Sequence, residues 1–530
     1  MKKRLFLAVL TALLLGQAPA HDRDDWNAGL EKIRQAAAVI EAEYVKPVTE
    51  QELAVSAVRG VLDTLDPHSY FLDQDGYSRM REDYSGRYFG VGLQIQKQGD
   101  NLVVVSPIEG GPGWRLGIQP GDIISGIDGE STVPISSYDA MQKLRGEGGT
   151  QVTITIMRYG LEKPFDVVIT REEIPLSSIP YVFMLDEATG YVYMRNFAEN
   201  TPDELEDALK KLSGQGMKNL VLDLRLNPGG PLLQCVQVAD LFLPDNTLIV
   251  SMRGRNRLFD KDFYALRNGQ YEELPLVILI DQGSASASEI VSGAIMDHDR
   301  GLVVGEDSWG KGLVQTVFPL APDMAVALTV AKYLTPSGRS IQRDYSQIDD
   351  YMLSKNVPEG NREVRFTDSG RKVLGQGGIT PDYKVNSLLM PVTGRLRLSG
   401  AFFSYARRLY NHQTDLGRKM IFPNEKAGRE PGAGKILVAR PFVAGPEVLA
   451  DFFESLKTQP GQFDEKELDA AREEIRRELE REITGAVWGF EEGVRISRLT
   501  DPAVIKALEV MPEAVSFLKN MRAAAAVIQR

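Results

Sequence analysis

The stretch from Leu274 to Pro319 reads LPLVILIDQGSASASEIVSGAIMDHDRGLVVGEDSWGKGLVQTVFP. Its apolar run over residues 276–280 has the length and composition of a strand that is covered on both faces. A polar turn ends that run, and the pattern then predicts a helix over about 286–296 and a second strand at 302–304. Strands that alternate with helices in this way indicate an α/β core.

Ser286 lies at the strand-to-helix turn of this stretch, where backbone N–H groups and the helix dipole can stabilise a developing oxyanion. A lysine activates such a serine only in its neutral form. A free lysine has a pKa of about 10.4, and burial can lower that value by several units. Lys311, which lies among glycines and apolar residues, is a candidate for such burial. Ser286 and Glu289 also form a capping-box pattern, which is a purely structural interpretation of the same residues.

Five sequence blocks accompany these residues and together point to one family. In chain order they are Asp223-Leu-Arg-Leu-Asn-Pro-Gly-Gly230, Gly283-Ser-Ala-Ser-Ala-Ser-Glu-Ile290, Gly310-Lys-Gly-Leu-Val-Gln315, Tyr333-Leu-Thr-Pro-Ser-Gly-Arg339 and Gly378-Ile-Thr-Pro-Asp382. Over residues 30–388 the chain thus resembles the carboxyl-terminal processing peptidases, which are PDZ-containing tail-specific serine proteases. The resemblance implies that Ser286 is the nucleophile, Lys311 the general base and Gln315 the glutamine that orients the lysine.

The oxyanion hole is expected where a buried strand turns into a helix. Residues 219–224 form an apolar strand pattern, and Asn227-Pro-Gly-Gly230 follows it directly. A strand, a glycine turn and a helix leave N–H groups exposed. The resemblance implies one donor in the pair Gly229 and Gly230 and the other on the N–H of Ala287, and it implies a crotonase-like core. The sequence leaves open which glycine donates.

Two observations bear on how the serine is activated. Lys311 and Gln315 are four residues apart, an offset that brings the glutamine carbonyl near the lysine amine on a helix or a tight turn. The chain has four histidines, and only His298 lies near Ser286 in sequence. At the expected end of the helix, that histidine more often caps the helix or faces solvent than completes a catalytic triad. A His298 triad is the alternative to the lysine.

Residues 88–172 resemble a PDZ domain. A glycine-rich turn enters a strand there, and such turns offer backbone N–H groups to the terminal carboxylate of a peptide, which then adds to the sheet as a strand. The predicted peptide-binding residues are Phe89, Gly90, Val91, Gly92 and Leu93.

Composition limits the remaining possibilities. The chain has 530 residues, of which 43% are hydrophobic and 25% charged, as in ordinary globular proteins of several domains. A net charge of −12 argues against nucleic acid as a partner. The single cysteine, Cys235, excludes an intramolecular disulfide. The sequence contains no cluster typical of a metal site, so neither a metal nor another cofactor is expected.

Residues 1–20 have the pattern of an export signal, with a basic start, a short apolar core and Ala18-Pro-Ala20 before the expected cut at His21. We therefore expect a periplasmic protein, with association to a membrane left open. The predicted domains are the signal peptide (1–20), a helical region (21–87), the PDZ domain (88–172), the peptidase core (173–388) and a mostly helical extension (389–530). The narrow apolar stripes of this extension suggest oligomerisation or partner docking.

Taken together, the sequence predicts an exported serine endopeptidase of an α/β multidomain fold. It would recognise protein C-termini through its PDZ domain and cleave by a Ser-Lys dyad through an acyl-enzyme. The expected partners are protein substrates with accessible C-termini, an activating adaptor and a second copy of the chain, without nucleic acid and without a transmembrane span in the mature protein. One alternative is a non-catalytic PDZ adaptor that binds protein C-termini. Another is an acyl-transfer or hydratase-like enzyme of the same core fold.

Overall fold

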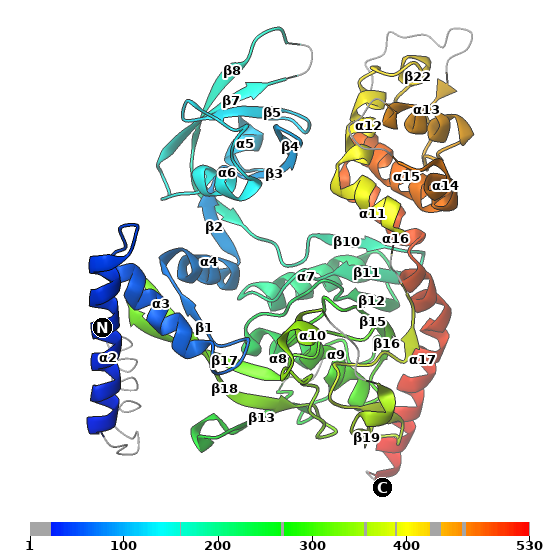
Figure 1. Cartoon of the computed structure of the whole chain (residues 1–530). Helices are drawn as coiled ribbons and strands as arrows, with labels where there is room; N and C mark the ends of the chain where they lie inside the picture. Colours follow the sequence, from blue (N-terminus) through cyan, green and yellow to red (C-terminus); the bar gives the residue numbers. More distant parts are fainter. Residues whose placement is uncertain are drawn as a thin grey trace. The chain divides into compact units, whose positions relative to one another are not determined.

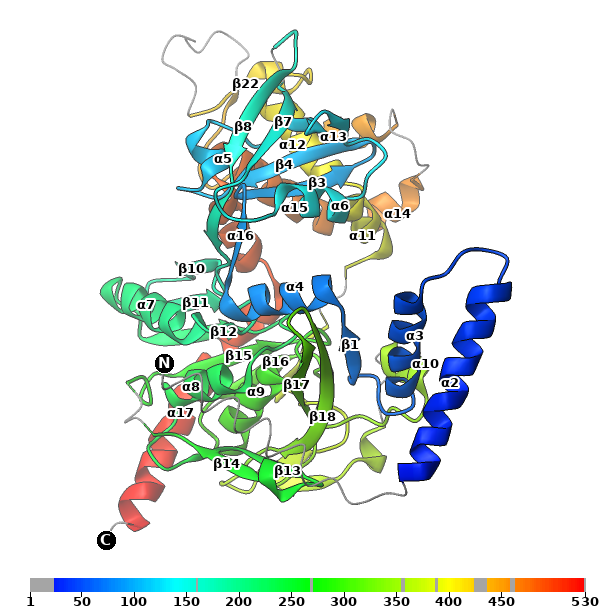
Figure 2. The ribbon, with the colours of Figure 1, turned by 90° about the vertical axis from the view of Figure 1, so that its left-hand side faces the viewer.

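The computed structural model describes residues 23–158, 161–266, 270–353, 358–386, 389–423, 436–457 and 463–528. The predicted signal peptide lies outside these residues. The chain forms two compact units, of which the first comprises Met1–Tyr77 and Gln315–Thr329 and the second comprises Ser78–Val314 and Val330–Arg530. Figures 1 and 2 show the ribbon of the whole chain from two directions.

A six-stranded sheet forms the centre of the second unit. Its strands lie in the order β10 (Tyr181–Met184), β11 (Thr189–Tyr193), β12 (Asn219–Asp223), β15 (Leu276–Ile280), β16 (Leu302–Gly305) and β21 (Tyr383–Lys384). The pair β10 and β11 is antiparallel, and all later pairs are parallel. The predicted strand at 276–280 is therefore confirmed at the middle of an α/β sheet.

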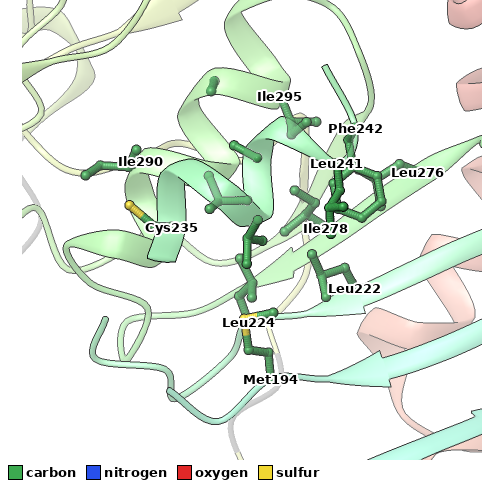
Figure 3. Close-up of a cluster of buried hydrophobic side chains, with 14 of the residues drawn as sticks. Met194, Leu222, Leu224, Cys235, Leu241, Phe242, Leu276, Ile278, Ile290 and Ile295 are labelled. Atoms are coloured by element: carbon green, nitrogen blue, oxygen red, sulfur yellow. The ribbon is translucent and has the colours of Figure 1, made fainter. Parts of the chain in front are cut away.

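The two faces of this sheet bury alternate residues of each strand, because successive side chains of a strand point to opposite faces. Leu222, Leu276 and Ile278 belong to a core shared with α7 (Thr201–Gly214), α8 (Leu232–Asp240) and α9 (Ala287–Asp297). Figure 3 shows this core, with Leu222 and Ile278 on the strands near the helices that carry Cys235 and Ile295. Apolar runs in the strands thus reflect burial on both sides.

The second face of the sheet is covered by the end of the chain. Val221, Val277 and Leu279 share a buried cluster with residues of α16 (Phe490–Leu499) and α17 (Pro502–Ile528). In both views α17 runs beside the central strands as the red helix (Figures 1 and 2). The last helix of the predicted extension therefore completes the three-layer core of the second unit.

The other helices of the extension have a core of their own. They are α11 (Pro391–Leu398), α12 (Ala401–Tyr410), α13 (Pro446–Leu456), α14 (Glu465–Ala470) and α15 (Arg472–Trp488). Leu468 of α14 and Ile475, Leu479 and Ile483 of α15 are all buried in it. The helical content predicted for this region is observed.

A second sheet of the same unit has the strand order β3 (Leu93–Gln98), β4 (Asn101–Pro107), β5 (Ile123–Ile127), β7 (Gln151–Met157) and β8 (Phe165–Thr170), and β6 (Glu130–Ser131) pairs with β5. The short helix α5 (Pro112–Arg115) and α6 (Ser137–Leu144) accompany it. A separate ribbon pairs β2 (Arg87–Gly90) with β9 (Glu172–Pro175). Strand β3 lies at the edge of the sheet.

The first unit contains α2 (Arg23–Glu43), α3 (Glu50–Leu62) and β1 (Tyr70–Leu72), and the helix α4 (Gln74–Ser85) begins in it. Strand β1 pairs with residues 325–327 of β18 (Met324–Leu334), which also pairs with β17 (Leu313–Ala321). In the part of the chain that the structure describes, no helix has the length and apolar character to span a membrane.

Candidate active site

Ser286 occupies a strained backbone position at the start of α9. Its φ of 53° and ψ of −109° lie outside the regions that L-residues prefer, at a cost of roughly 1–3 kcal/mol. It is the N-cap residue of the helix and is half-buried. Strain of this kind persists where the surrounding structure holds the residue in place, and strained residues cluster at functional sites.

The buried carboxylate of Glu289 holds two loops together. Its Oε2 accepts the backbone N–H of Ser286 at 2.7 Å and that of Lys311 at 2.9 Å. Its Oε1 accepts the N–H of Gly310 at 2.7 Å and the hydroxyl of Ser308 at 2.5 Å. Burial raises the pKa of the Glu289 carboxyl above its usual value, and the four hydrogen bonds oppose that rise.

This contact brings the backbones of the predicted nucleophile and the predicted base to one oxygen atom. The sequence pattern identifies Glu289 only as a helix cap. The glutamate does cap the Ser286 N–H, but its bonds to Gly310 and Lys311 come from a loop some twenty residues later, which no local pattern indicates.

The glycine turn after β12 packs directly on the serine. A Cβ added to Gly229 would lie 2.9 Å from the Cβ of Ser286 and 2.8 Å from the carbonyl oxygen of Ala285. The φ of Gly229 is +100°, which L side chains rarely adopt. Only glycine therefore permits this approach of the two loops.

Hydrogen bonds fix the two loops against each other. The hydroxyl of Ser288 donates to the carbonyl of Asn227 at 2.9 Å, and the N–H of Ala285 donates to the same oxygen at 3.0 Å. The hydroxyl of Ser284 donates to the carbonyl of Leu224 at 2.8 Å. Ser284 and Ser288 are fully buried in these structural bonds, which separates them from Ser286.

The predicted oxyanion donors differ in their hydrogen bonding. The N–H of Gly229 donates to the side-chain oxygen of Asn227 at 2.9 Å. Among the described residues, the N–H groups of Gly230 and Ala287 have no hydrogen-bond acceptor. These two N–H groups are therefore available to a substrate oxygen, while that of Gly229 is engaged.

Lys311 is half-buried in the loop before β17. Lys311 and Gln315 share neither a helix nor a tight turn, because Gln315 lies on strand β17. Gln315 belongs to the first unit, where its side-chain amide donates to the hydroxyl of Thr329 at 3.3 Å. That hydroxyl in turn donates to Asp66 at 3.1 Å.

His298 lies at the end of α9 that is opposite to Ser286. The helix has 11 residues, which at 1.5 Å per residue separates its ends by roughly 16 Å. The ring nitrogens of His298 contact Asp368 and the carbonyl of Leu248, both at 2.7 Å. Burial disfavours its charged form, but these two acceptors outweigh burial and raise the pKa of His298. The alternative of a His298 triad is therefore excluded.

A groove lies beside the edge strand β3, at the predicted peptide-binding segment. Val91, Leu93 and Ile95 line it together with Met141 and Leu144 of the α6 region, and its volume is about 400 Å³. Gly92 allows the tight turn of this segment, since its φ is +67°. Phe89 and Gly90 lie on β2, where they pair with β9, and Phe89 is 43% exposed.

Comparison with known proteins is consistent with this geometry. The Peptidase family S41 profile matches residues 188–350, the PDZ domain profile matches 103–158, and the profile named Activating protease CtpB N-terminal domain matches 14–76. The carboxy-terminal-processing protease of Bartonella bacilliformis is 40% identical over 351 residues, which are 64% of this chain and 80% of that protein.

The chain belongs to the carboxy-terminal-processing proteases of family S41. The carboxyl-terminal-processing protease of Synechocystis is 36% identical over 58% of this chain and 72% of its own length. A probable CtpA-like serine protease of Staphylococcus aureus is 33% identical over 68% of this chain and 74% of its own. The predicted family, the serine-protease class and the PDZ domain are thus confirmed for this S41 protease, whereas the crotonase-like description of its core stays a prediction.

Proposed function

We propose that this S41 protease is an exported endopeptidase that cleaves peptide bonds with a dyad of Ser286 and Lys311. The observation that carries the proposal is the shared carboxylate of Glu289, which binds the backbone N–H of both residues. Such a contact maintains a fixed spacing between a nucleophile and its base, as activation of a serine requires.

In the proposed mechanism, neutral Lys311 accepts the proton of the Ser286 hydroxyl while the serine oxygen attacks the substrate carbonyl. The N–H groups of Gly230 and Ala287 stabilise the oxyanion of the tetrahedral intermediate. The intermediate collapses to the acyl-enzyme as the lysine returns its proton to the leaving amine. Water then attacks the ester, again with Lys311 as base, and releases the second product.

Gln315 is proposed as the residue that orients the lysine, on the resemblance alone. The groove beside β3 is proposed to bind the C-terminus of a protein substrate, with N–H groups of residues 89–93 on its carboxylate and the peptide added to β3 as a strand. Residues 1–20 are proposed to direct the chain to the periplasm. The oligomer and the activating adaptor stay predictions.

The test uses the mature chain and an unfolded reporter that ends in a small apolar tail, followed by intact mass. Ser286→Ala and Lys311→Ala should produce no fragments, and Gln315→Ala should slow their release. Ser292→Ala on the same helix and Lys332→Ala on β18 are the matched controls and should cleave normally. Cleavage by Lys311→Ala at the wild-type rate would overturn the dyad.

The substrate-binding part has its own test. A reporter with an amidated C-terminus should be bound and cleaved less than the same reporter with a free carboxylate. If the wild type bound the reporter but cut neither form, a non-catalytic adaptor would replace the protease proposed here.

A further inference from the structure

A buried ion pair precedes the glycine turn of the active site. Arg225 donates from Nε at 2.9 Å and from Nη2 at 2.6 Å to the carboxylate of Asp223, which is fully buried. Asp223 also accepts the hydroxyl of Tyr191 at 2.6 Å. Burial works to raise the pKa of Asp223, but the Arg225 guanidinium outweighs it and holds that pKa below its usual value.

The remaining nitrogen of this guanidinium reaches the C-terminal helix. Arg225 Nη1 lies 3.0 Å from Oδ1 and 2.9 Å from Oδ2 of Asp501. Only 11% of the Arg225 side chain and 12% of the Asp501 side chain are exposed. The same aspartate accepts the N–H of Ala503 at 2.9 Å and that of Val504 at 3.3 Å, in the first turn of α17. One carboxylate thus caps the helix and binds the arginine.

Helix α17 is a firm support for this contact. Val504, Ala507 and Val510 are buried against the second face of the central sheet. Figure 1 shows the helix beside the strands over most of its length. The position of Asp501 is therefore set by the sheet itself.

The arginine is held between two carboxylates directly before the turn that carries the oxyanion donor. Leu226, the next residue, has a φ of +59°, and its N–H donates to Asp281 at 2.9 Å. Without Asp501, Arg225 would keep both of its side-chain bonds to Asp223, but its Nη1 would lose the Asp501 oxygens. The cluster of Arg225, Arg498 and Asp223 would also carry surplus positive charge. In the wild type, Nη1 of Arg498 lies 3.5 Å from Oδ2 of Asp501.

We propose that Asp501 is a positioning residue for the oxyanion hole, so that the C-terminal helix is part of the catalytic apparatus. This inference rests on the function proposed above, since it assigns Gly230 to the oxyanion. Asp501 acts through Arg225 on the backbone of residues 226–230 and does not touch the substrate.

The experiment compares Asp501→Asn with Glu513→Gln in the full mature chain. Asparagine still caps a helix well, so the first variant keeps α17 but loses the charge that binds Arg225. The second variant removes a carboxylate from the same helix at a point remote from the turn. For both we would measure kcat and KM on the unfolded reporter, the melting temperature, and the amide hydrogen exchange of a peptide covering residues 224–230. Asp501→Glu serves as the conservative rescue.

We expect Asp501→Asn to lower kcat about ten-fold or more with little change in KM, because small displacements of a catalytic group cost that much. Its 224–230 peptide should exchange faster than in the wild type, and Asp501→Glu should restore part of both losses. Glu513→Gln should change neither readout.

Exchange in Asp501→Asn that equals the wild type, or an equal loss of kcat in both variants, would overturn the inference. If the wild type cleaved nothing, the proposed function would fail, and the exchange comparison would still decide whether Asp501 positions the turn.

Discussion

Replacing Glu289 with glutamine tests the central contact of the active site. The side chain keeps its size, but one oxygen becomes an NH₂ group. Each glutamate oxygen accepts two donors, and three of the four are backbone N–H groups. In either orientation the new amide faces at least one N–H that has no acceptor left, and the other bonds lose their charge.

The magnitude follows from these bonds. One buried unsatisfied N–H costs roughly 1–3 kcal/mol, and hydrogen bonds to a neutral acceptor are weaker by about 1 kcal/mol each. We therefore expect the free energy of unfolding to fall by about 2–5 kcal/mol. The glutamine would relax by moving one loop away from the other, and a shift of about 1 Å between nucleophile and base costs on the order of 100-fold in kcat.

Asp297→Asn is the matched control, since Asp297 is a second fully buried carboxylate at the opposite end of the same helix. It pairs with Arg339 at 2.7 Å, and breaking a buried pair costs roughly 3–5 kcal/mol. The melting temperature of both variants would be measured by calorimetry. Their kcat on the unfolded reporter would be measured at a temperature well below the melting temperature of the less stable variant.

Both variants should be less stable than the wild type, and only Glu289→Gln should lose most of its kcat. The reasoning would be refuted if Glu289→Gln kept kcat within three-fold of the wild type. It would also be refuted if Asp297→Asn lost as much kcat, because a general loss of stability would then explain both results.

Three further predictions concern Gly229, His298 and Cys235. Gly229→Ala should abolish cleavage and lower the melting temperature, since the added Cβ would lie 2.9 Å from that of Ser286 at a φ of +100°; an active, stable variant would contradict the close approach. The raised pKa of His298 means that its pairing with Asp368 stabilises the fold fully below pH 6.5 and that this stabilisation is lost as the pH rises through the folded pKa. The melting temperature should therefore fall less between pH 6 and pH 9 in His298→Gln than in the wild type. An equal fall in both proteins would argue against the stabilising role of His298. Burial raises the pKa of the Cys235 thiol, so a thiol reagent should label the protein only after denaturation; rapid labelling of the native chain would show that Cys235 is accessible.

The sequence by itself was sufficient to identify the family and to predict the strands and the helix around the site. Apolar runs identified the strands at 276–280 and 302–304, because residues buried on both faces leave an unbroken pattern. The turn residues predicted the start of α9 at Ser286 within one residue, since caps act on neighbours in the chain. These are short-range properties, and a linear pattern records them.

Only the tertiary structure decided how those pieces act together. The carboxylate of Glu289 meets N–H groups from a loop that follows it by some twenty residues, and Asp501 meets Arg225 across 276 positions of the chain. Gln315 lies on a strand although its spacing from Lys311 equally suits a helix, because pairing with β18 outweighs local preference. Hydrogen bonds and ion pairs between distant segments depend on where the folded chain brings each group, and no spacing within the sequence encodes that position.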